Sequence, residues 1–472
     1  MQQQTKVNAS VKTTGEPRPT TRELAEFAAG ATYSSLPAPL KDRIRTDAVD
    51  TVAVGVLGHT HSWVATATEL WEEQGGAPQA TLWGRSSKLP LPRAVLANSH
   101  AANSFEFDDT YVWGGFGTHQ GNNVVPAGLG TAEWLGGISG QQLLLALAVG
   151  HEIGIRIMRG FIRRRPGWNG TALASTFGAA ATCGKLLGLD VDQMTWALGS
   201  AGSYVGGLLT MPPHSMVKRL VNGRAAEGGV LGALLAQRGF TGIDNLLEAR
   251  QGGFYQCHAE EYDLDRVVDG LGHEWFSVNI HTKRFPMCTS VHAPLEATIK
   301  LVRDHRIASQ DVTKVVVRTT AGAQKNTVGY TPKTISSAQL SLAFGIATAV
   351  HTADVLPQCV SEEALADPEI QRLMALVEAV ADPELDDMWK GRGGSAGPSR
   401  VEIELRNGIR YESKLIPEAS RMSNEEIEAK ARNALRASLN EQKAEGVIEF
   451  FKRLDQHTSV DPLFDQLRKK RE

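Results

Sequence analysis

The chain has 472 residues, with 49 lysines and arginines against 52 aspartates and glutamates, so its formal charge is 49 − 52 = −3. This near balance argues against nucleic acid or an anionic membrane as a partner, because both attract proteins with a net positive surface. The length and a hydrophobic content of 42% predict a folded chain of about two or three domains.

The ends of the chain and its cysteines indicate the compartment. Residues 1–19 are polar, which predicts disorder and no secretory signal, and the longest apolar run, Leu143 to Val149, is too short to span a bilayer. The four cysteines lie far apart, with no zinc-finger spacing, so we expect no disulfide framework and no structural metal. They are Cys183, Cys257, Cys288 and Cys359. These features favour a cytoplasmic protein.

The first large portion of the chain has the periodicity of helices. Thr20-Thr21-Arg22-Glu23 matches a capping box and predicts a helix start. Up to Phe276, alanine, leucine and glycine then recur at spacings of three and four residues, which predicts an all-helical domain. The clearest helices are expected over 48–57, 94–103, 141–157, 176–187 and 223–238. Their many small residues indicate helices that approach one another closely.

The character changes after Phe276. Val312 to Thr319 is β-branched and alternating, and two further alternating runs flank Asn407-Gly408, a strong hairpin signal. With helices expected over 291–304 and 338–353, this portion predicts a smaller α+β lid domain over 277–414. A second capping box at Ser423 to Glu426 predicts a C-terminal helix that returns to the first domain. The fold class is therefore mainly α, with one domain formed by 20–276 plus 415–472.

Motifs for nucleotides and metals fail on inspection. Gly391-x-Gly393-x-x-Ala396 fits the dinucleotide fingerprint in letters, but it precedes a strand instead of following one. Gly184-Lys185 lacks the first glycine and the hydroxyl of a phosphate loop and is expected inside a helix. His151-Glu152 and His273-Glu274 lack a second histidine four residues on. We therefore predict no metal and no cofactor.

Three polar clusters stand in otherwise apolar surroundings. They are Glu106 to Thr110 with His119, Lys218 before Asn222-Gly223-Arg224, and Lys283-Arg284 with His292. Each alone is also explained as a turn, a solvated face or a structural histidine. Together they supply carboxylate, imidazole and ammonium groups, the set expected for abstracting a proton beside a carboxylate and stabilising the resulting charge.

At these residues the chain resembles the MmgE/PrpD family, over nearly its whole length. The similar segments are Asp108-Asp109-Thr110 with Thr118-His119, Val124-Val125-Pro126-Ala127, Gly178-Ala179-Ala180-Ala181, Lys185 to Asp190, Lys218 with Gly223-Arg224-Ala225-Ala226, Gly239-Phe240-Thr241-Gly242, and Lys283-Arg284-Phe285-Pro286 with Cys288 and His292. The resemblance implies a helical domain with an α+β lid, a homodimer, an active site between the domains and no required cofactor.

The resemblance also implies roles for individual residues. It assigns catalysis to Asp109, His119, Lys218 and Lys283. Substrate binding is expected of Glu106, Thr110, Asn169, Thr171, Arg165, Arg284, Cys288 and His292. Three positions depart from the family's pattern: Asn169 replaces an active-site histidine, Cys288 stands where decarboxylase-like members often have histidine, and Phe344 replaces the usual tyrosine. The segment between Thr110 and His119 is also longer than usual.

The implied function is that of a cofactor-independent lyase, a hydratase or dehydratase of a di- or tricarboxylic acid such as a 2-methylcitrate-like substrate. An epimerase or decarboxylase of a polycarboxylate, iminodisuccinate- or cis-aconitate-like, is the alternative, and a non-catalytic binding member is the second. The run Arg163-Arg164-Arg165 is read either as a solvated basic face or as an electropositive mouth that attracts a polyanion.

Overall fold

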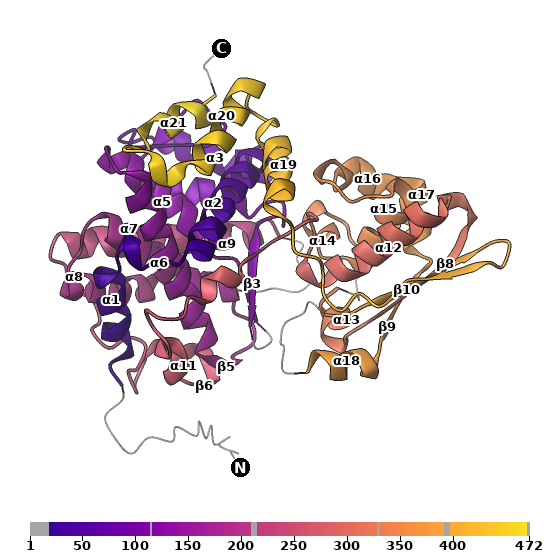
Figure 1. Ribbon diagram of the computed structural model, residues 1–472, viewed down its shortest axis with the longest axis horizontal. Helices are drawn as coiled ribbons and strands as arrows, with labels where there is room; N and C mark the ends of the chain where they lie inside the picture. Colours follow the sequence, from indigo (N-terminus) through magenta and orange to yellow (C-terminus); the bar gives the residue numbers. More distant parts are fainter. Residues whose placement is uncertain (1–17, 114–115, 209–214, 328–330, 391–396, 470–472) are drawn as a thin grey trace.

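A computed structural model of the chain describes residues 18–113, 116–208, 215–327, 331–390 and 397–469. Figure 1 shows a large helical body beside a smaller unit of helices and a four-stranded sheet, which we call the lid. The prediction of a mainly α fold is confirmed. Within the described ranges, every helix is too short or too polar to cross a membrane.

The helices of the body enclose one another in several layers. Those that matter for the site are α2 (Ala38–Gly58), α4 (Leu91–Ala102), α5 (Gly121–Leu135), α6 (Gly140–Arg159), α7 (Gly170–Leu186) and α9 (Val217–Gln237). Around them lie α1 (Thr20–Gly30), α3 (Ser62–Gln74), α8 (Val191–Ala201), α10 (Phe254–His258) and α11 (Asp265–Val268). The five segments predicted from periodicity are confirmed, and Gly184-Lys185 lies inside α7 as expected.

Small residues let these helices approach closely, as their frequency predicted. Between α6 and α7, a Cβ added at Gly178 would lie 2.8 Å from the carbonyl oxygen of Gly150. That separation is too short for a carbon and an oxygen, so only glycine fits there. The α6–α7 contact therefore depends on backbone packing against backbone.

A helix begins where the first capping box predicted one, but the capping box itself is not formed. Thr20 is the first residue of α1, and Pro19 occupies the N-cap position without a side-chain hydrogen bond. Glu23 pairs with Arg18 instead of capping the helix, and the Thr21 hydroxyl donates to Glu248. The disorder predicted for the N-terminal residues falls, for 1–17, outside the described residues.

The body is not purely helical, contrary to the expectation of an all-helical domain. It contains short strands: β1 (Ala80–Thr81), β2 (Lys88–Leu89), β3 (Asp109–Trp113), β4 (Phe116–Thr118), β5 (Phe161–Arg164) and β6 (Ala259–Tyr262). β7 (His281–Thr282) lies within the range predicted for the lid, 277–414, but pairs with β3 of the body. β3 lies between β4 and β7 and pairs with both in antiparallel fashion. These strands are too short to give an alternating pattern that could be recognised in the sequence.

The lid is built on a sheet of strand order β11-β10-β8-β9. β8 (Val312–Thr319) and the hairpin of β10 (Arg400–Leu405) and β11 (Arg410–Glu412) confirm the predicted strands, and Gly408 has the positive φ of 82° that the turn requires. β9 (Val377–Ala381) runs parallel to β8. The segment 391–396, which contains Gly391-x-Gly393-x-x-Ala396, lies outside the described residues.

Helices cover the lid sheet and form its apolar core with it. α12 (His292–His305) matches the prediction, whereas the helix expected over 338–353 is divided into α14 (Ile335–Ala338) and α15 (Leu342–Thr352). The remaining helices are α13 (Ala321–Thr327), α16 (Glu362–Ala366), α17 (Pro368–Met374) and α18 (Pro383–Trp389). Phe344 is fully buried in this core.

The chain returns to the body at its C-terminal end. The capping box of Ser423 and Glu426 is confirmed and opens α19 (Asn424–Leu435), which is followed by α20 (Glu441–Lys452) and α21 (Asp461–Leu467). α19 and α20 pack on α2, and Figure 1 shows α19 on the side of the body that faces the lid. The domain boundaries 20–276 plus 415–472 and 277–414 stay a prediction.

Candidate active site

The pairing of two short strands brings distant polar residues together. Asp109 of β3 faces Thr282 of β7 in the antiparallel register, so the next residue, Lys283, lies beside Asp108. The Lys283 amide nitrogen is 3.4 Å from the Asp108 carbonyl oxygen. α9 packs across α4 and places Lys218, in its first turn, over the same segment.

Five charged side chains meet at this point, and we call them the charged cluster: Glu106, Asp108, Lys218, Arg219 and Lys283. Lys283 Nζ lies 3.1 Å from Glu106 Oε1 and 3.0 Å from Asp108 Oδ1. Lys218 Nζ lies 3.3 Å from Glu106 Oε2, and Arg219 pairs with that same oxygen. Three cations face two carboxylates, so the cluster carries a net charge of 3 − 2 = +1 and favours an incoming anion.

Glu106 is held in an unusual backbone conformation. Its φ is +53°, in the left-handed region that side chains other than glycine, asparagine and aspartate seldom adopt. Such a conformation costs on the order of 1–3 kcal/mol and is found mostly at functional sites. It turns the Glu106 carboxylate toward the three cations of the charged cluster.

The cluster fixes the charge of its members. Burial opposes ionisation of Glu106, but Lys218, Lys283 and Arg219 outweigh it and hold the pKa of Glu106 well below its usual range. Burial likewise opposes ionisation of Asp108, and Lys283 with His119 lowers its pKa. Both residues are therefore carboxylates at neutral pH.

The two lysines differ in their electrostatic surroundings. Burial disfavours the charged form of Lys283, yet Asp108 and Glu106 raise its pKa above the usual value. The pKa of Lys218 is lowered, first by burial and then by the nearby Arg219. Lys283 is thus a permanent cation, whereas Lys218 can release its proton more readily than an exposed lysine.

His119 lies directly after β4, where the hairpin with β3 returns the chain to Asp109. Its Nδ1 is 2.5 Å from the Asp109 carbonyl oxygen, so Nδ1–H donates and Nε2 is left with a free lone pair. Burial and then Lys283 lower the pKa of His119, which favours the neutral ring. The side chains of His119 and Lys218 are 21% and 18% exposed, so they form the accessible side above a buried floor of Glu106, Asp108 and Lys283.

Asp109 points away from the charged cluster. Its Oδ2 accepts from the Gln120 amide and its Oδ1 from the Gly121 amide, both at 3.0 Å, so it caps the start of α5. Burial, then Asp47 and Asp108, raise the pKa of Asp109 well above its usual value. The structure therefore places Asp108, and not the predicted Asp109, in contact with Lys283.

Several predicted substrate-binding residues lie near His119. The Thr171 hydroxyl accepts from the His119 amide at 3.1 Å, and Asn169 Oδ1 accepts from the Ala172 amide as the N-cap of α7. Thr110 is buried in β3. Cys288 is half-buried and close enough to Lys218 and Lys283 to interact electrostatically with both.

Other predicted residues are engaged elsewhere. Arg284 forms a two-point ion pair with Glu426 of α19, with N–O distances of 2.8 and 3.1 Å, and so joins the lid to the body. Arg165 is half-exposed and donates to the Gln256 carbonyl. His292 is buried against Phe285, and burial with Lys283 lowers its pKa to about 3. The structure does not bring Arg284 or Arg165 into the charged cluster, whereas His292 lies close enough to Lys283 and Glu106 to interact electrostatically with both.

Comparison with known proteins identifies the relatives of the chain. Residues 22–266 match the MmgE/PrpD N-terminal domain, and residues 285–456 match the MmgE/PrpD C-terminal domain. The chain belongs to the MmgE/PrpD family. It is 30% identical to the cis-aconitate decarboxylase of Aspergillus terreus (strain NIH 2624 / FGSC A1156), over 95% of both chains. It is 30% identical to that of Homo sapiens over 56% of this chain and 55% of the human protein, and 29% identical to that of Mus musculus over 56% and 54%.

These relatives are lyases, and the prediction that the chain is an enzyme of the MmgE/PrpD family is confirmed. The break between the two matched regions, at 266–285, precedes the lid. The second matched region extends to residue 456 and thus includes α19 and α20, which pack on the body.

Reasoning from the sequence missed two buried cations, Arg219 and Lys430, that contact the residues of this candidate site. Arg219 is fully buried and joins Glu106 to the Gln339 side chain. Lys430 of α19 pairs with Asp50 at 2.9 Å and donates to the carbonyl oxygens of Phe107 and Lys283. A buried Arg219 next to Lys218 leaves no pattern in the sequence, and Lys430 lies in an ordinary amphipathic helix.

A cavity of about 1080 Å³ adjoins the site between α12 and α19. Phe105, Phe107, Arg284 and Lys430 line it, whereas His119, Lys218 and Lys283 are absent from its walls. Phe107, which follows Glu106 in the chain, is thus a wall residue of this cavity. The Asp47, Asp109 and His151 side chains form a separate group that could hold a metal, with ligand atoms within 4.8 Å of one another.

Proposed function

We propose that this MmgE/PrpD enzyme is a cofactor-independent lyase of a small di- or tricarboxylic acid, acting by proton transfer at the carbon beside a carboxylate. The single observation that carries the proposal is the arrangement of His119, with Nδ1 bound to a carbonyl and Nε2 free, next to a charged cluster with one excess positive charge. A base and a cationic site for the developing charge are the two groups this chemistry requires.

The geometry supports distinct roles for the three groups. His119 Nε2 takes the proton from the carbon beside the substrate carboxylate. That carboxylate gains a second negative charge as the proton leaves. Lys218, the accessible cation, binds the doubly charged group more tightly than it binds the singly charged carboxylate of the substrate. Lys283 lies in the floor, holds Glu106 and Asp108 in place and contributes its fixed charge.

Dehydration is the outcome we propose first, because the lowered pKa of Lys218 suits a donor to a departing hydroxyl. Decarboxylation is the second candidate, and the observation in its favour is the 30% identity to a named cis-aconitate decarboxylase over 95% of both chains. Asn169, which caps α7 here in place of an imidazole, supports a substrate or outcome that differs from that of the relatives.

Turnover of a panel of polycarboxylates in D₂O, followed by proton NMR, tests the proposal. The panel contains 2-methylcitrate, citrate, cis-aconitate and iminodisuccinate. A new alkene signal indicates dehydration, carbon dioxide with one deuteron in the product indicates decarboxylation, and inversion without other change indicates epimerisation. The proposal fails if no acid is converted and no carbon-bound proton exchanges, as expected of a non-catalytic binding protein.

The homodimer implied by the family resemblance is also part of the proposal. Light scattering of the full chain after size-exclusion chromatography measures its mass directly. A mass of one 50.9 kDa chain at micromolar concentration would contradict it.

A further inference from the structure

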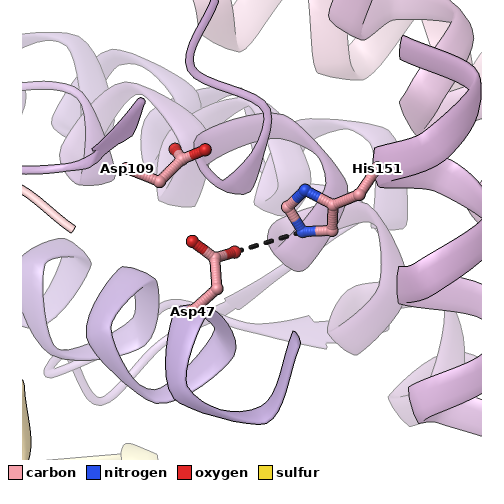
Figure 2. A group of neighbouring side chains, drawn as sticks. All are labelled: Asp47, Asp109 and His151. Carbon is pink, nitrogen blue, oxygen red and sulfur yellow. Dashed lines mark ion pairs between the residues drawn. The ribbon is translucent and has the colours of Figure 1, made fainter. Parts of the chain in front are cut away.

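Three polar side chains converge on the side of β3 that faces away from the charged cluster. Asp47 comes from α2, Asp109 from β3 and His151 from α6, and Figure 2 shows all three pointing toward one another. Each offers a ligand atom, and these atoms all lie within 4.8 Å of one another. All three residues are at most 1% exposed.

A fourth donor faces the same point. Thr51 follows Asp47 by one helical turn on α2, is fully buried, and its hydroxyl has no hydrogen-bond partner. A Cβ added at Gly121 would lie 2.7 Å from Thr51 Oγ1, 2.9 Å from Asp47 Oδ2 and 3.0 Å from Asp109 Oδ1. Three oxygens therefore approach the same face of residue 121, which is possible because glycine has no side chain.

The protein groups leave Asp47 and His151 poorly satisfied. Neither Asp47 oxygen and neither His151 nitrogen has a hydrogen bond, although His151 Nε2 lies 3.1 Å from Asp47 Oδ2. Buried carboxylates without hydrogen bonds are costly, and those in proteins are paired or bind metals. Asp109 accepts two backbone hydrogen bonds and Arg43 acts electrostatically on Asp47, but two acidic side chains still face a single imidazole, so a divalent cation would offset their negative charge.

We propose that Asp47, Thr51, Asp109 and His151 bind one divalent transition-metal ion of the Mn²⁺ or Zn²⁺ type. Ligand atoms up to 4.8 Å apart can share one ion, because metal–ligand bonds of about 2.0 to 2.6 Å span that distance across the ion. Carboxylate and hydroxyl oxygens suit Mn²⁺, and the imidazole favours Zn²⁺ over Mg²⁺ or Ca²⁺.

The site would tie α2, β3 and α6 together behind the candidate active site. Asp109 contributes its carboxylate on this side of β3, while its carbonyl oxygen holds His119 on the other. The ion would thus be structural, without contact with substrate. Spacing rules could not reveal it, because its ligands are scattered over residues 47 to 151, and the sequence alone predicted no metal.

Metal binding by the full chain tests the inference independently of any activity. The protein is stripped with a chelator, desalted and dialysed against Mn²⁺, Zn²⁺ or Mg²⁺, and the bound metal is measured by mass spectrometry. We expect about one equivalent of Mn²⁺ or Zn²⁺ per chain and none of Mg²⁺. A folded protein that retains less than about a tenth of an equivalent overturns the proposal and leaves a shared proton as the neutralising charge.

Variants connect the bound ion to these ligands. Asp47→Asn should abolish binding, whereas Asp42→Asn, on the exposed side of the same helix, should not change it. Because Asp47 is buried and its variant could unfold, Thr51→Val serves as the second test: it keeps the shape and should weaken binding about 10- to 100-fold, and Thr51→Ser should restore it. Equal binding by Thr51→Val and the parent, both folded, contradicts the assignment.

Cobalt(II) distinguishes this site from adventitious binding at the exposed Cys257. Bound at the proposed ligands, Co²⁺ should show visible bands without the ultraviolet charge-transfer band of a thiolate. A thiolate band that disappears in Cys257→Ser would show that the measured metal lies at the cysteine, and the proposal would be wrong.

Discussion

Asp108 and Asp109 are neighbours in the chain, yet they lie in opposite surroundings. Asp108 faces Lys283, His119, Asn103 and Asn122 and belongs to a cluster with an excess of cations. Asp109 faces Asp47 and His151 in a closed space with an excess of carboxylates. The pKa of Asp108 is therefore lowered and that of Asp109 is raised, because the backbone directs the two side chains into these different surroundings. Two residues of the same type can therefore have different roles when the pairing of β3 with β7 gives their side chains different neighbours.

The largest effect should follow the loss of Lys283, the cation that pairs with both carboxylates of the charged cluster. Lys283→Met leaves the buried Glu106 and Asp108 carboxylates without their shared partner, so we expect a loss of about 3 to 5 kcal/mol in unfolding free energy and of activity. Denaturant unfolding measures it. Lys300→Met, at an exposed ion pair of the lid, is the control and should change stability little.

His119, the proposed base, should contribute to the catalytic rate and little to the stability of the fold. His119→Ala should lower kcat by about 100- to 10,000-fold, the usual contribution of a positioned base. Its unfolding midpoint should stay near that of the parent, because the ring is partly exposed. The exposed His351→Ala provides the matched histidine control. A His119→Ala enzyme with full kcat would remove this residue from the mechanism.

A paired substitution tests the contrast between the neighbours directly. Asp108→Asn should lower kcat/KM by about tenfold or more, since hydrogen bonds to charged groups contribute about 1.5 to 3 kcal/mol. Asp109→Asn should act mainly through the start of α5 and the metal proposed behind it, with the smaller effect on kcat/KM. Steady-state kinetics of both variants give the comparison. The reverse order would return the catalytic role to Asp109.

The pH profile should reveal the lowered pKa of Lys218. A lysine with a lowered pKa loses its charge at a lower pH than an exposed lysine does. As the pH is raised, the decrease in kcat/KM should therefore begin before pH 10.5, the usual pKa of a lysine. Lys218→Arg should move that fall to higher pH, because arginine stays protonated. Cys288→Ser, which removes the side chain that interacts electrostatically with both lysines, is the control. An alkaline limb that moves only in Cys288→Ser would refute the assignment.

The smallest effect is expected at the α7 N-cap. Asn169→His removes a side chain that caps the helix, which should cost about 1 kcal/mol in unfolding free energy. It also introduces the imidazole that the family resemblance implies at this position, so activity toward cis-aconitate should appear or rise. Asn169→Ala gives the cap loss alone. Equal activities of the two variants would show that the residue does not direct the outcome.

Much of the fold could be predicted because its signals are local. The long helices follow from the spacing of apolar residues, and the lid hairpin from Asn407-Gly408. β3 and β7 escaped prediction because β7 has only two residues and carries no pattern of its own. Their pairing depends on the packing of the whole body, which no local rule contains.

The site was predictable as a set of residues and not as a geometry. The run Glu106 to Thr110 and the two lysines could be named from chemistry and resemblance. Choosing Asp108 over Asp109 required knowing the side to which each points, and finding Arg219 required the α4–α9 contact. The ion pair of Arg284 could not be predicted either, because its partner, Glu426, lies 142 residues further along the chain.

Lys430 has a consequence for how the protein is made. Its ammonium group holds the Phe107 and Lys283 carbonyls together, but it belongs to a helix that follows the lid in the chain. When the lid has been synthesised, the residue that joins Phe107 to Lys283 has not yet been made. The nascent enzyme therefore completes this part of the site only after α19 has emerged and packed on α2.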